Sequence, residues 1–302
     1  MEKVSVLILG CDGMLGHKLY QVLNGDPSFI TYGTSRRFNN PSSIFFDPLK
    51  NFKDLKAILI DLKIDVVINC IGVLNHSKNQ TQLIDINSIF PKKLELLLLE
   101  TEIKIIHLST DCVFNGEEGN YSEKSLPDAK DLYGKSKFLG ELNNSKDLTI
   151  RCSIIGPELK SDHNTGLLNW FLKEITNKNY ITGYANVYWS GTSTLKLSQL
   201  ILYSIKNNLN GLIHVSVPRK ISKLSLLELF TNCLKANIKI EPSEELQYDK
   251  SLISVDNQLS INSEYKEIIE EMFEDIYKNQ SLYDYYKLNN YDYDPTRIKT
   301  IS

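Results

Sequence analysis

Apolar runs with the length of β-strands alternate with segments of helical periodicity along the first half of the chain. The strand-length runs cover residues 4–9, 29–33, 44–48, 65–72 and 103–108. Between them, apolar residues recur at helical spacing, as in residues 17–23, 55–62 and 91–99. Runs without polar alternation are typical of a parallel sheet covered on both faces. The order therefore predicts an α/β fold with a doubly wound parallel sheet, which binds ligands at the carboxyl ends of its strands.

Three glycines separate the first predicted strand from the first predicted helix. Gly10, Gly13 and Gly16 follow the pattern G-x-x-G-x-x-G. Here the backbone amides and the helix dipole favour a phosphate, and glycine lets the backbone approach it. An ordinary tight turn would use the same glycines, but the flanking strand and helix favour a dinucleotide site.

Two arginines follow the second predicted strand, where a dinucleotide-binding chain usually carries an acidic residue. The segment reads Thr34-Ser35-Arg36-Arg37. Because a guanidinium group can pair with a 2′-phosphate, the segment favours NADP over NAD, with a solvated basic turn as the alternative. Asp47, in the next predicted strand, can reach the adenine or its ribose.

A phenol, an ammonium group and a hydroxyl form the main candidate for chemistry. Tyr133 and Lys137 are four residues apart, so on a helix they share one face. A free tyrosine has a pKa near ~10, and a nearby cation lowers that pKa toward neutral pH. Thr110, just after the strand 103–108, can then orient a substrate oxygen. The alternative is a solvated helix face.

Six motifs resemble, in their order and spacing, those of the extended short-chain dehydrogenase/reductase family. The resemblance is greatest to the dTDP-4-dehydrorhamnose reductase group of nucleotide-sugar reductases. The motifs are Gly10–Gly16, Asn69–Gly72, Asn87, Ser109–Phe114, Tyr133–Lys137 with Gly140-Glu141, and Arg151–Pro157. They lie in the first half of the chain, and weaker matches follow at residues 167–172, 183–184, 189–191 and 211–215.

The resemblance implies a Rossmann fold with a smaller C-terminal substrate-binding lid. The cofactor domain would comprise residues 1–156 and 189–217, and the lid residues 157–188 and 218–302. In such an enzyme, Tyr133 gives a proton to a sugar ketone while the nicotinamide delivers hydride to the carbon. Lys137 binds the nicotinamide ribose and lowers the pKa of the phenol, and Thr110 hydrogen-bonds the reacting oxygen.

The same resemblance assigns residues to the cofactor and to the substrate. Asn87 is expected in the helix that lines the cofactor cleft. The expected cofactor-binding residues are Gly10, Asp12, Gly13, Met14, Leu15, Gly16, Ser35, Arg36, Asp47, Cys70, Ile71, Gly72, Asn87, Ser109, Tyr133, Lys137 and Ser153. The expected substrate-binding residues are Asp111, Cys112, Val113, Phe114 and Trp189. Trp189 and Tyr184 are expected either to stack on the nucleotide base or to pack in the core.

One departure from the family pattern concerns the sugar. Cys112 stands where the rhamnose-forming enzymes commonly carry a second tyrosine that touches the sugar. The expected activity is NAD(P)H-dependent reduction of a 4-keto-6-deoxy nucleotide-sugar in surface-polysaccharide biosynthesis, and C4 reduction of a UDP-N-acetyl-6-deoxyhexose is an alternative. A second alternative is a non-catalytic cofactor-binding module, because the regulatory β subunit of methionine adenosyltransferase resembles the same family.

Composition and charge argue against several other classes. The chain has 302 residues and a formal net charge of −3, which gives no electrostatic footprint for nucleic acid. Because there is neither an apolar stretch of membrane-spanning length nor a signal-peptide pattern, no membrane partner and a cytoplasmic location are expected. The five cysteines fit reduced thiols, and the histidines show no metal-ligand spacing. His107 and His214 are expected to be satisfied core residues.

The C-terminal region carries five tyrosines without clear periodicity. They are Tyr283, Tyr285, Tyr286, Tyr291 and Tyr293. This region is expected either to pack on a partner subunit, as in a homodimer, or to fray as a tail.

Overall fold

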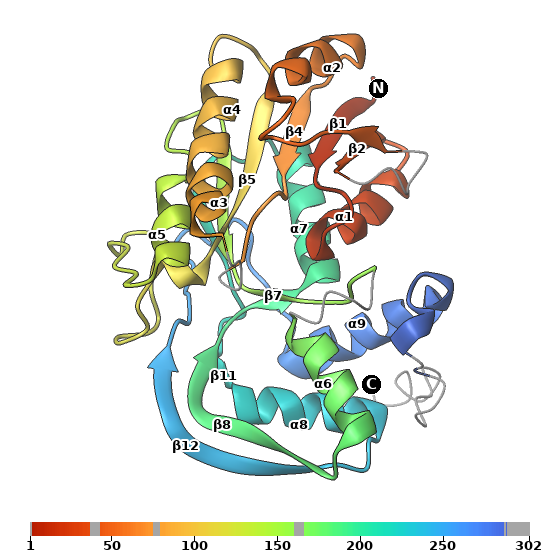
Figure 1. The fold of residues 1–302 in the computed structure, drawn as a ribbon, viewed down its shortest axis with the longest axis vertical. Coiled ribbons are helices and arrows are strands. Elements are labelled where there is room, and N and C mark those ends of the chain that lie inside the picture. Colours follow the sequence, from red (N-terminus) through yellow and green to blue (C-terminus); the bar gives the residue numbers. More distant parts are fainter. Residues whose placement is uncertain (1, 37–42, 75–78, 160–165, 287, 289–302) are drawn as a thin grey trace.

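A seven-stranded parallel sheet forms the centre of the protein (Figure 1). The computed structural model describes residues 2–36, 43–74, 79–159, 166–286 and 288. In spatial order the strands are β10 (Gly211–Val215), β6 (Leu148–Cys152), β5 (Lys104–Thr110), β4 (Val66–Asn69), β1 (Val4–Leu9), β2 (Phe29–Ser35) and β3 (Ile44–Phe45). The predicted doubly wound sheet is confirmed, although the strand predicted at 44–48 ends after two residues because Pro48 begins a turn.

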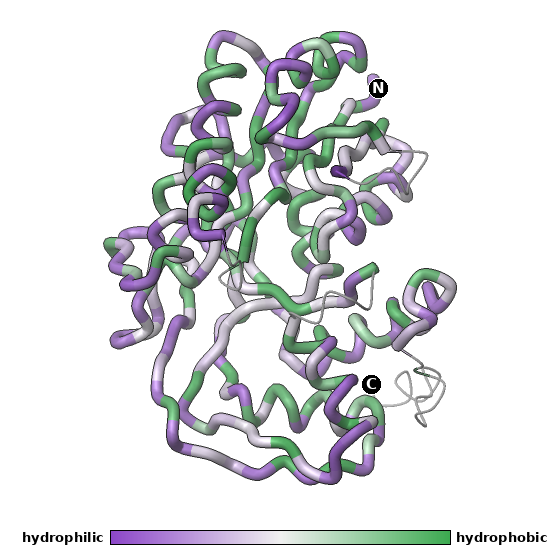
Figure 2. The backbone as a smooth tube through the Cα atoms, viewed as in Figure 1, coloured by the Kyte–Doolittle hydropathy of each residue, from purple (hydrophilic) through white to green (hydrophobic). Residues whose placement is uncertain are grey.

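Helices cover both faces of this sheet. One face packs against α1 (Met14–Asn24) and α7 (Thr194–Lys206), and the other against α2 (Leu55–Asp61) and α4 (Phe90–Leu98). The strands between them are correspondingly hydrophobic, whereas the outer helices alternate between polar and apolar residues (Figure 2). Burial on both faces explains why the strand sequences show no polar alternation.

A helical stretch beside the sheet changes its pitch in the middle. It begins with α3 (Gln80–Ile84), passes through a π-helical turn (Asp85–Ile89) and continues as α4. The helix α5 (Leu132–Leu139) packs against the π-helical turn near the carboxyl ends of the strands. A π-helical turn inside a helix is frequently found at a functional site.

A smaller unit lies below the carboxyl ends of the central strands in Figure 1. Its three-stranded sheet has the order β11 (Ile221–Ser222), β8 (Tyr180–Trp189) and β12 (Lys239–Asp249). Its helices are α6 (Leu167–Asn177), α8 (Lys223–Leu234) and α9 (Tyr265–Lys278), and the short strands β7 (Ile154–Ile155) and β9 (Thr192–Ser193) pair where it meets the main sheet. Trp189 is the last residue of β8.

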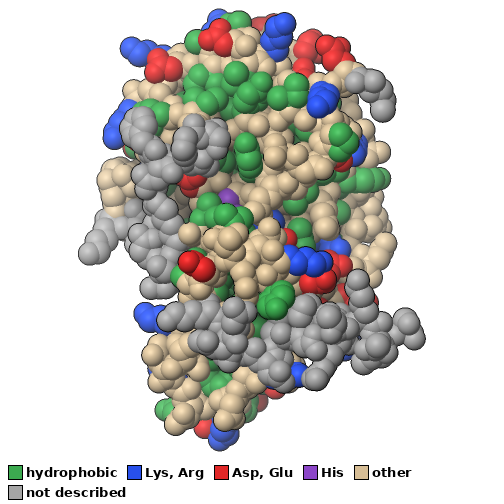
Figure 3. Space-filling model, turned by 90° about the vertical axis from the view of Figure 1, so that its right-hand side faces the viewer, with side chains coloured by type: hydrophobic (Ala, Val, Ile, Leu, Met, Phe, Trp, Pro, Cys, Tyr) green, Lys and Arg blue, Asp and Glu red, His purple; other side chains and the backbone are tan. Residues whose placement is uncertain are grey.

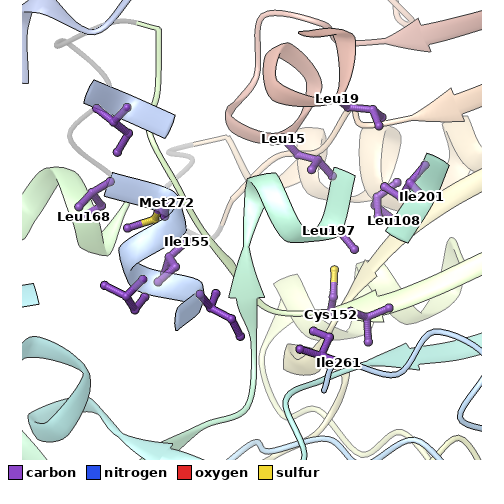
Figure 4. Packing of buried hydrophobic residues seen from close by; sticks show 14 of the residues in the cluster. Leu15, Leu19, Leu108, Cys152, Ile155, Leu168, Leu197, Ile201, Ile261 and Met272 are labelled. Carbon is purple, nitrogen blue, oxygen red and sulfur yellow. The ribbon is translucent and has the colours of Figure 1, made fainter. Parts of the chain in front are cut away.

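One hydrophobic core runs through both units. Leu19 of α1 and Ile201 of α7 pack under the main sheet, and Leu168 of α6 and Met272 of α9 belong to the same buried cluster. Figure 4 shows these two groups of side chains on either side of Ile155 in β7. The smaller unit is therefore packed onto the main sheet through continuous apolar contact.

The surface in Figure 3 mixes charges of both signs. Lysine and arginine side chains lie interspersed with aspartate and glutamate on this face, without a large area of one sign. This arrangement agrees with the formal net charge of −3.

The C-terminal segment (residues 275–286) packs on its own chain. The Tyr283 side chain is buried, and its hydroxyl lies 2.8 Å from Nε2 of His17 in the first turn of α1. Next to this contact, the Lys18 ammonium pairs with the Asp275 carboxylate at 2.5 Å. The expectation of a frayed tail is therefore wrong up to Tyr286, because the Tyr283 and Tyr286 rings are buried in the protein's own core. Packing on a partner subunit stays a prediction. Tyr291 and Tyr293 lie outside the described residues.

His17 is held in its neutral form by its surroundings. Its Nδ1 lies 2.9 Å from the Gly13 carbonyl, which can only accept, so Nδ1 carries the proton. Nε2 then accepts a hydrogen bond from the Tyr283 hydroxyl. Burial lowers the pKa of His17 to about 4.

This burial predicts an acid-sensitive contribution to stability. In the unfolded chain His17 titrates near its ordinary pKa of ~6.5, so between that pH and about 4 the unfolded state binds the extra proton and stability falls as the pH falls. Relative to a His17→Gln variant, the protein should lose about 2 kcal/mol of unfolding free energy between pH 7 and 5. Urea unfolding across this range measures the difference. The control Tyr283→Phe keeps the buried imidazole and should keep the pH slope; parallel curves for the protein and His17→Gln would contradict the prediction.

Candidate active site

The glycine turn after β1 brings its backbone very close to α1. Gly10 has φ +84°, a left-handed conformation that glycine adopts without strain. A Cβ atom on Gly16 would lie only 2.1 Å from the Gly10 carbonyl oxygen. Gly13 occupies the N-cap of α1 and has no side chain to bond the first amides of the helix. The turn thus presents backbone and the positive end of a helix at the carboxyl edge of the sheet, which suits a phosphate. Met14 and Leu15 form the first turn of this helix.

The glycine turn is joined to the end of β2. The Ser35 hydroxyl donates a hydrogen bond to the Asp12 carboxylate, and the Gly10 amide donates to the Thr34 hydroxyl at 3.2 Å. Arg36 follows directly and is exposed, as a residue that reads a 2′-phosphate needs to be. Arg37, which the sequence pairs with it, lies outside the described residues.

Asp47 is largely occupied by its own turn. Its carboxylate accepts a hydrogen bond from the Leu49 amide at 3.0 Å, and its backbone amide donates to the Asn51 side chain at 2.8 Å. The residue is buried beside β3. The structure thus gives Asp47 a local role in ending the strand.

Asn87 connects the loop after β4 to α5. Its side chain accepts from the Val73 amide and donates to the Val73 carbonyl, both at 2.9 Å, and it also donates to the Ser136 hydroxyl at 3.2 Å. These bonds hold the loop after β4, which contains residues 70–72, against the π-helical turn and α5. Asn87 therefore lies in a helical segment, as the sequence predicted, and its place in a cofactor cleft stays a prediction.

The threonine, tyrosine and lysine meet at the carboxyl end of β5. Thr110 is the last residue of the strand, and its hydroxyl accepts from the Cys112 amide at 3.1 Å and donates to the Asp111 carboxylate at 3.0 Å. The Thr110 hydroxyl also interacts with the Tyr133 phenol, which places the two side chains next to each other. The buried Lys137 ammonium donates to the Leu108 carbonyl of the same strand at 2.6 Å.

Burial sets the acidity of both groups on α5. It raises the pKa of the Tyr133 phenol, an effect that the Thr110 hydrogen bond opposes. It lowers the pKa of Lys137 to about 8. The expectation that Lys137 lowers the pKa of Tyr133 is therefore wrong for this structure, because desolvation of the phenol dominates and the ammonium faces a strand carbonyl.

Two glycines let α5 approach its neighbours. A Cβ atom on Gly134 would lie 2.1 Å from the Cys112 carbonyl oxygen, and one on Gly140 would lie 1.9 Å from the Asn87 carbonyl oxygen. The Asp131 side chain caps the helix by accepting from the Gly134 amide at 2.9 Å. These contacts fix the position of α5 and hence of the side chains it carries.

A buried ion pair fixes the chain just after α5. Arg151 of β6 donates twice to the Glu141 carboxylate, from Nε and Nη2, both at 2.7 Å. The Ser109 hydroxyl donates to the same carboxylate at 2.6 Å, so this predicted cofactor residue serves the ion pair. His214 lies 3.3 Å from Arg151 and has further backbone partners, as expected for a core histidine. His107 bonds Asn69 through Nδ1, but among the described residues its buried Nε2 has no partner.

A cavity of about 410 Å³ opens beside Thr110. It is lined by Asp111, Cys112, Asn115, Ser153, Tyr188, Trp189, Lys223, Tyr248 and Lys250. Asp111, Cys112, Ser153 and Trp189 were singled out in the sequence. Val113 and Phe114 do not line it, because both are fully buried in a small separate core.

A second cavity, of about 820 Å³, lies within the smaller unit. Its lining includes Trp170, Tyr184, Lys223 and Tyr248. Trp189 is not part of this lining: its indole donates to the Ser153 hydroxyl at 2.8 Å, and the ring is almost completely buried. Tyr184 is thus available to a ligand in the larger cavity, whereas Trp189 mainly packs in the core.

Sequence reasoning did not find the cavity residues of β12 and α8. Lys223, Tyr248 and Lys250 reach the site only because β12 pairs in parallel with β8 and α8 follows β11. No local motif marks these residues.

Two other kinds of site have no candidates among the described residues. Across the described ranges, no helix combines the length and the apolar character needed to cross a membrane. In the same part of the chain, histidine, cysteine, aspartate and glutamate form no group of three or more that is able to hold a metal ion.

Comparisons with known proteins agree with this geometry. The sequence model of the RmlD substrate binding domain matches residues 4–254. The crystal structure of dTDP-4-dehydrorhamnose reductase from Bacillus anthracis in complex with NADP superimposes with a TM-score of 0.78 at 20% identity, covering 90% of this chain and 99% of that one. This likeness supports the Rossmann-type fold.

Two curated relatives match over part of their length. Methionine adenosyltransferase 2 subunit beta of Xenopus tropicalis is 27% identical over 143 residues, which is 45% of this chain and 41% of the relative. The protein named "Probable low-salt glycan biosynthesis reductase Agl14" of Haloferax volcanii is 29% identical over 143 residues, which is 44% of this chain and 46% of the relative. The chain thus spans less than half the length of these relatives.

The close approach of α5 to the Asn87 carbonyl predicts that one added methyl group on α5 lowers the unfolding free energy of the protein. Gly140→Ala should lower the unfolding free energy by about 1–3 kcal/mol, because the new Cβ overlaps the Asn87 carbonyl and forces the helix to move. The matched control is Gly25→Ala at the end of α1, where the Cβ meets its nearest atom at 3.4 Å and φ is −77°. This control should change stability by less than about 1 kcal/mol. Chemical denaturation measures both, and equal effects of the two substitutions would contradict the prediction.

Proposed function

The chain belongs to the RmlD substrate binding domain family, and on this premise we propose that it is an NAD(P)H-dependent reductase of a 4-keto-6-deoxy nucleotide-sugar. The observation that carries the proposal is the grouping of Thr110, Tyr133 and Lys137 at the carboxyl end of β5. The glycine turn lies at the same edge of the sheet, and the smaller cavity opens next to Thr110. Such an edge is where doubly wound sheets bind their ligands.

The three side chains have complementary roles in the reduction. The bound dinucleotide supplies the hydride that the carbonyl carbon accepts. Tyr133 donates its phenolic proton to the carbonyl oxygen, and the Thr110 hydroxyl hydrogen-bonds that oxygen. At neutral pH the Tyr133 phenol is protonated, which is the form that a proton donor requires, and burial raises its pKa further. Lys137 binds the nicotinamide ribose.

NADP is the proposed cofactor, with NAD as the alternative. The close backbone approach at Gly16 and the open N-cap at Gly13 fit a dinucleotide phosphate, and the exposed Arg36 suits a 2′-phosphate. The complex of the Bacillus anthracis reductase with NADP supports the same choice. The remaining proposed cofactor residues are Asp12, Met14, Leu15, Ser35, Asp47, Cys70, Ile71, Gly72, Asn87, Ser109, Tyr133, Lys137 and Ser153.

The division into two domains is also a proposal. Residues 1–156 and 189–217 would bind the cofactor, and residues 157–188 and 218–302 would bind the nucleotide-sugar. The separate three-stranded sheet and the larger cavity of the smaller unit support this division (Figure 1).

The proposals for the pathway and the sugar draw on the name of one relative and on Cys112. The name of the Haloferax volcanii relative is in line with a reductase of glycan biosynthesis, and hence with surface-polysaccharide biosynthesis. Cys112 lines the smaller cavity where the related group carries a tyrosine, which keeps a UDP-N-acetyl-6-deoxyhexose as the alternative substrate. A homodimer remains a prediction.

A cofactor-binding regulatory subunit is the second candidate function. The match to methionine adenosyltransferase 2 subunit beta favours it. Such a subunit would bind the dinucleotide but would not need an aligned proton donor, so the intact group of Thr110, Tyr133 and Lys137 favours the reductase.

The decisive assay follows NADPH oxidation with a panel of 4-keto nucleotide-sugars. The protein should turn over at least one of them, and Tyr133→Phe should keep the cofactor affinity while lowering turnover by about 10²–10⁴-fold, because the proton donor is lost. Tyr203→Phe, an exposed tyrosine on α7, is the matched control and should keep full turnover. Near-native turnover of Tyr133→Phe would remove this residue from the acid role. Absence of turnover with every sugar would favour the regulatory subunit.

The proposed preference for NADPH predicts that substitution of Arg36 weakens the binding of NADPH but not that of NADH. Arg36→Ala should weaken NADPH binding by about tenfold or more and leave NADH binding nearly unchanged, since only NADPH carries the 2′-phosphate. Arg219→Ala, an exposed arginine before β11, is the control and should affect neither cofactor. Fluorescence titration with both cofactors measures the affinities. Equal losses for NADPH and NADH would mean that Arg36 does not read the phosphate.

A further inference from the structure

The two cavities share part of their walls. Lys223 and Tyr248 line both of them. The smaller cavity contains Asp111 and Cys112, next to the proposed catalytic group, whereas the larger one extends under β8 and α6. Lys223 therefore lies where the smaller cavity, next to the proposed catalytic group, meets the larger cavity of the smaller unit.

Lys223 carries a charge that the protein does not pair. It is the first residue of α8, where the helix dipole disfavours a cation. Among the described residues its ammonium forms neither an ion pair nor a hydrogen bond. It lies 5.0 Å from the centroid of the Trp189 ring, and the Asp111 carboxylate attracts it without forming an ion pair. Burial lowers the pKa of Lys223 to about 8, which reflects the cost of keeping this cation in place.

A second lysine faces the same cavity. Lys250 follows β12 and lines the smaller cavity, and among the described residues its ammonium also has no carboxylate partner. Lys220, three residues before Lys223, differs from both, because it pairs with Asp249 and lines neither cavity. Lys178 lines the larger cavity but pairs with Glu174. Of the lysines that line the cavities, Lys223 and Lys250 are thus the two without a carboxylate partner among the described residues.

We propose that Lys223 and Lys250 bind the diphosphate of the nucleotide-sugar, an inference that rests on the proposed function. A diphosphate joins the sugar to the nucleoside, so it must lie where the sugar compartment meets the nucleoside compartment. The sugar then occupies the smaller cavity beside Thr110. The nucleoside occupies the larger cavity, where Trp170, Tyr184 and Tyr248 offer aromatic surfaces. An anion at this place also removes the unfavourable interaction between Lys223 and the α8 dipole.

Calorimetric titration with thymidine and uridine, their monophosphates and their diphosphates tests the proposal without any turnover. The diphosphates should bind at least about tenfold more tightly than the nucleosides, and Lys223→Met and Lys250→Met should each remove about tenfold of that advantage while leaving nucleoside binding unchanged. Lys223→Arg keeps the charge and should retain the preference. Lys220→Met is the matched control and should behave as the unsubstituted protein. In turnover with an accepted sugar, the two methionine variants should raise KM with little change in kcat.

Three outcomes would overturn the proposal. The first is unchanged diphosphate affinity in folded Lys223→Met and Lys250→Met proteins. The second is a loss confined to a nucleotide-linked hexuronate, which would assign the lysines to a sugar carboxylate. The third is an equal loss in Lys220→Met, which would indicate a general effect of net charge. Failure of the proposed reductase is distinguishable from all three, because it abolishes NADPH oxidation and leaves these binding differences in place.

Discussion

The close contact between α5 and the strand ends is the constraint on which the candidate site depends. Tyr133 and Lys137 reach the carboxyl edge of the sheet only because Gly134 and Gly140 let the helix pass within contact distance of neighbouring carbonyl groups. A larger residue at Gly134 would push the helix away from the turn after β5, and one at Gly140 would push it away from the π-helical turn. A buried bidentate ion pair directly after the helix holds its end to β6. Backbone packing, rather than the side chains themselves, therefore sets the geometry of the site.

The same packing determines the chemistry of the two groups. Removal from water raises the pKa of Tyr133 and lowers that of Lys137, so both are driven toward their neutral forms. For a phenol that must donate a proton to a ketone, the neutral form is the competent one. In such surroundings, a charge that develops on the substrate oxygen interacts strongly with nearby donors such as Thr110, because little water screens it.

The first half of the structure was predictable because its signals are local. Apolar runs, helical spacing and the glycine turn each lie within a few residues, and they correctly gave the strands and the helical position of Asn87. The raised pKa of Tyr133 was not predictable, since it arises from packing between segments distant in sequence. Lys223 and Lys250 reach the cavities through the pairing of β8 with β12, about 60 residues apart, which no periodicity reveals. Among the described C-terminal tyrosines, Tyr283 contacts α1 and Tyr286 contacts α6, so their positions follow tertiary packing and not a periodic pattern.

The C-terminal segment connects the two halves of the site. Tyr283 bonds His17 in the first turn of α1, directly after the glycine turn. Three residues later, the Tyr286 hydroxyl accepts from the Glu158 amide at 2.9 Å and donates to Asn169 in α6, the helix beside the larger cavity. One short segment therefore holds both the helix that faces the proposed cofactor and the helix that faces the proposed nucleoside. Since a displacement of either helix breaks contacts with this segment, the two compartments do not take their shapes independently.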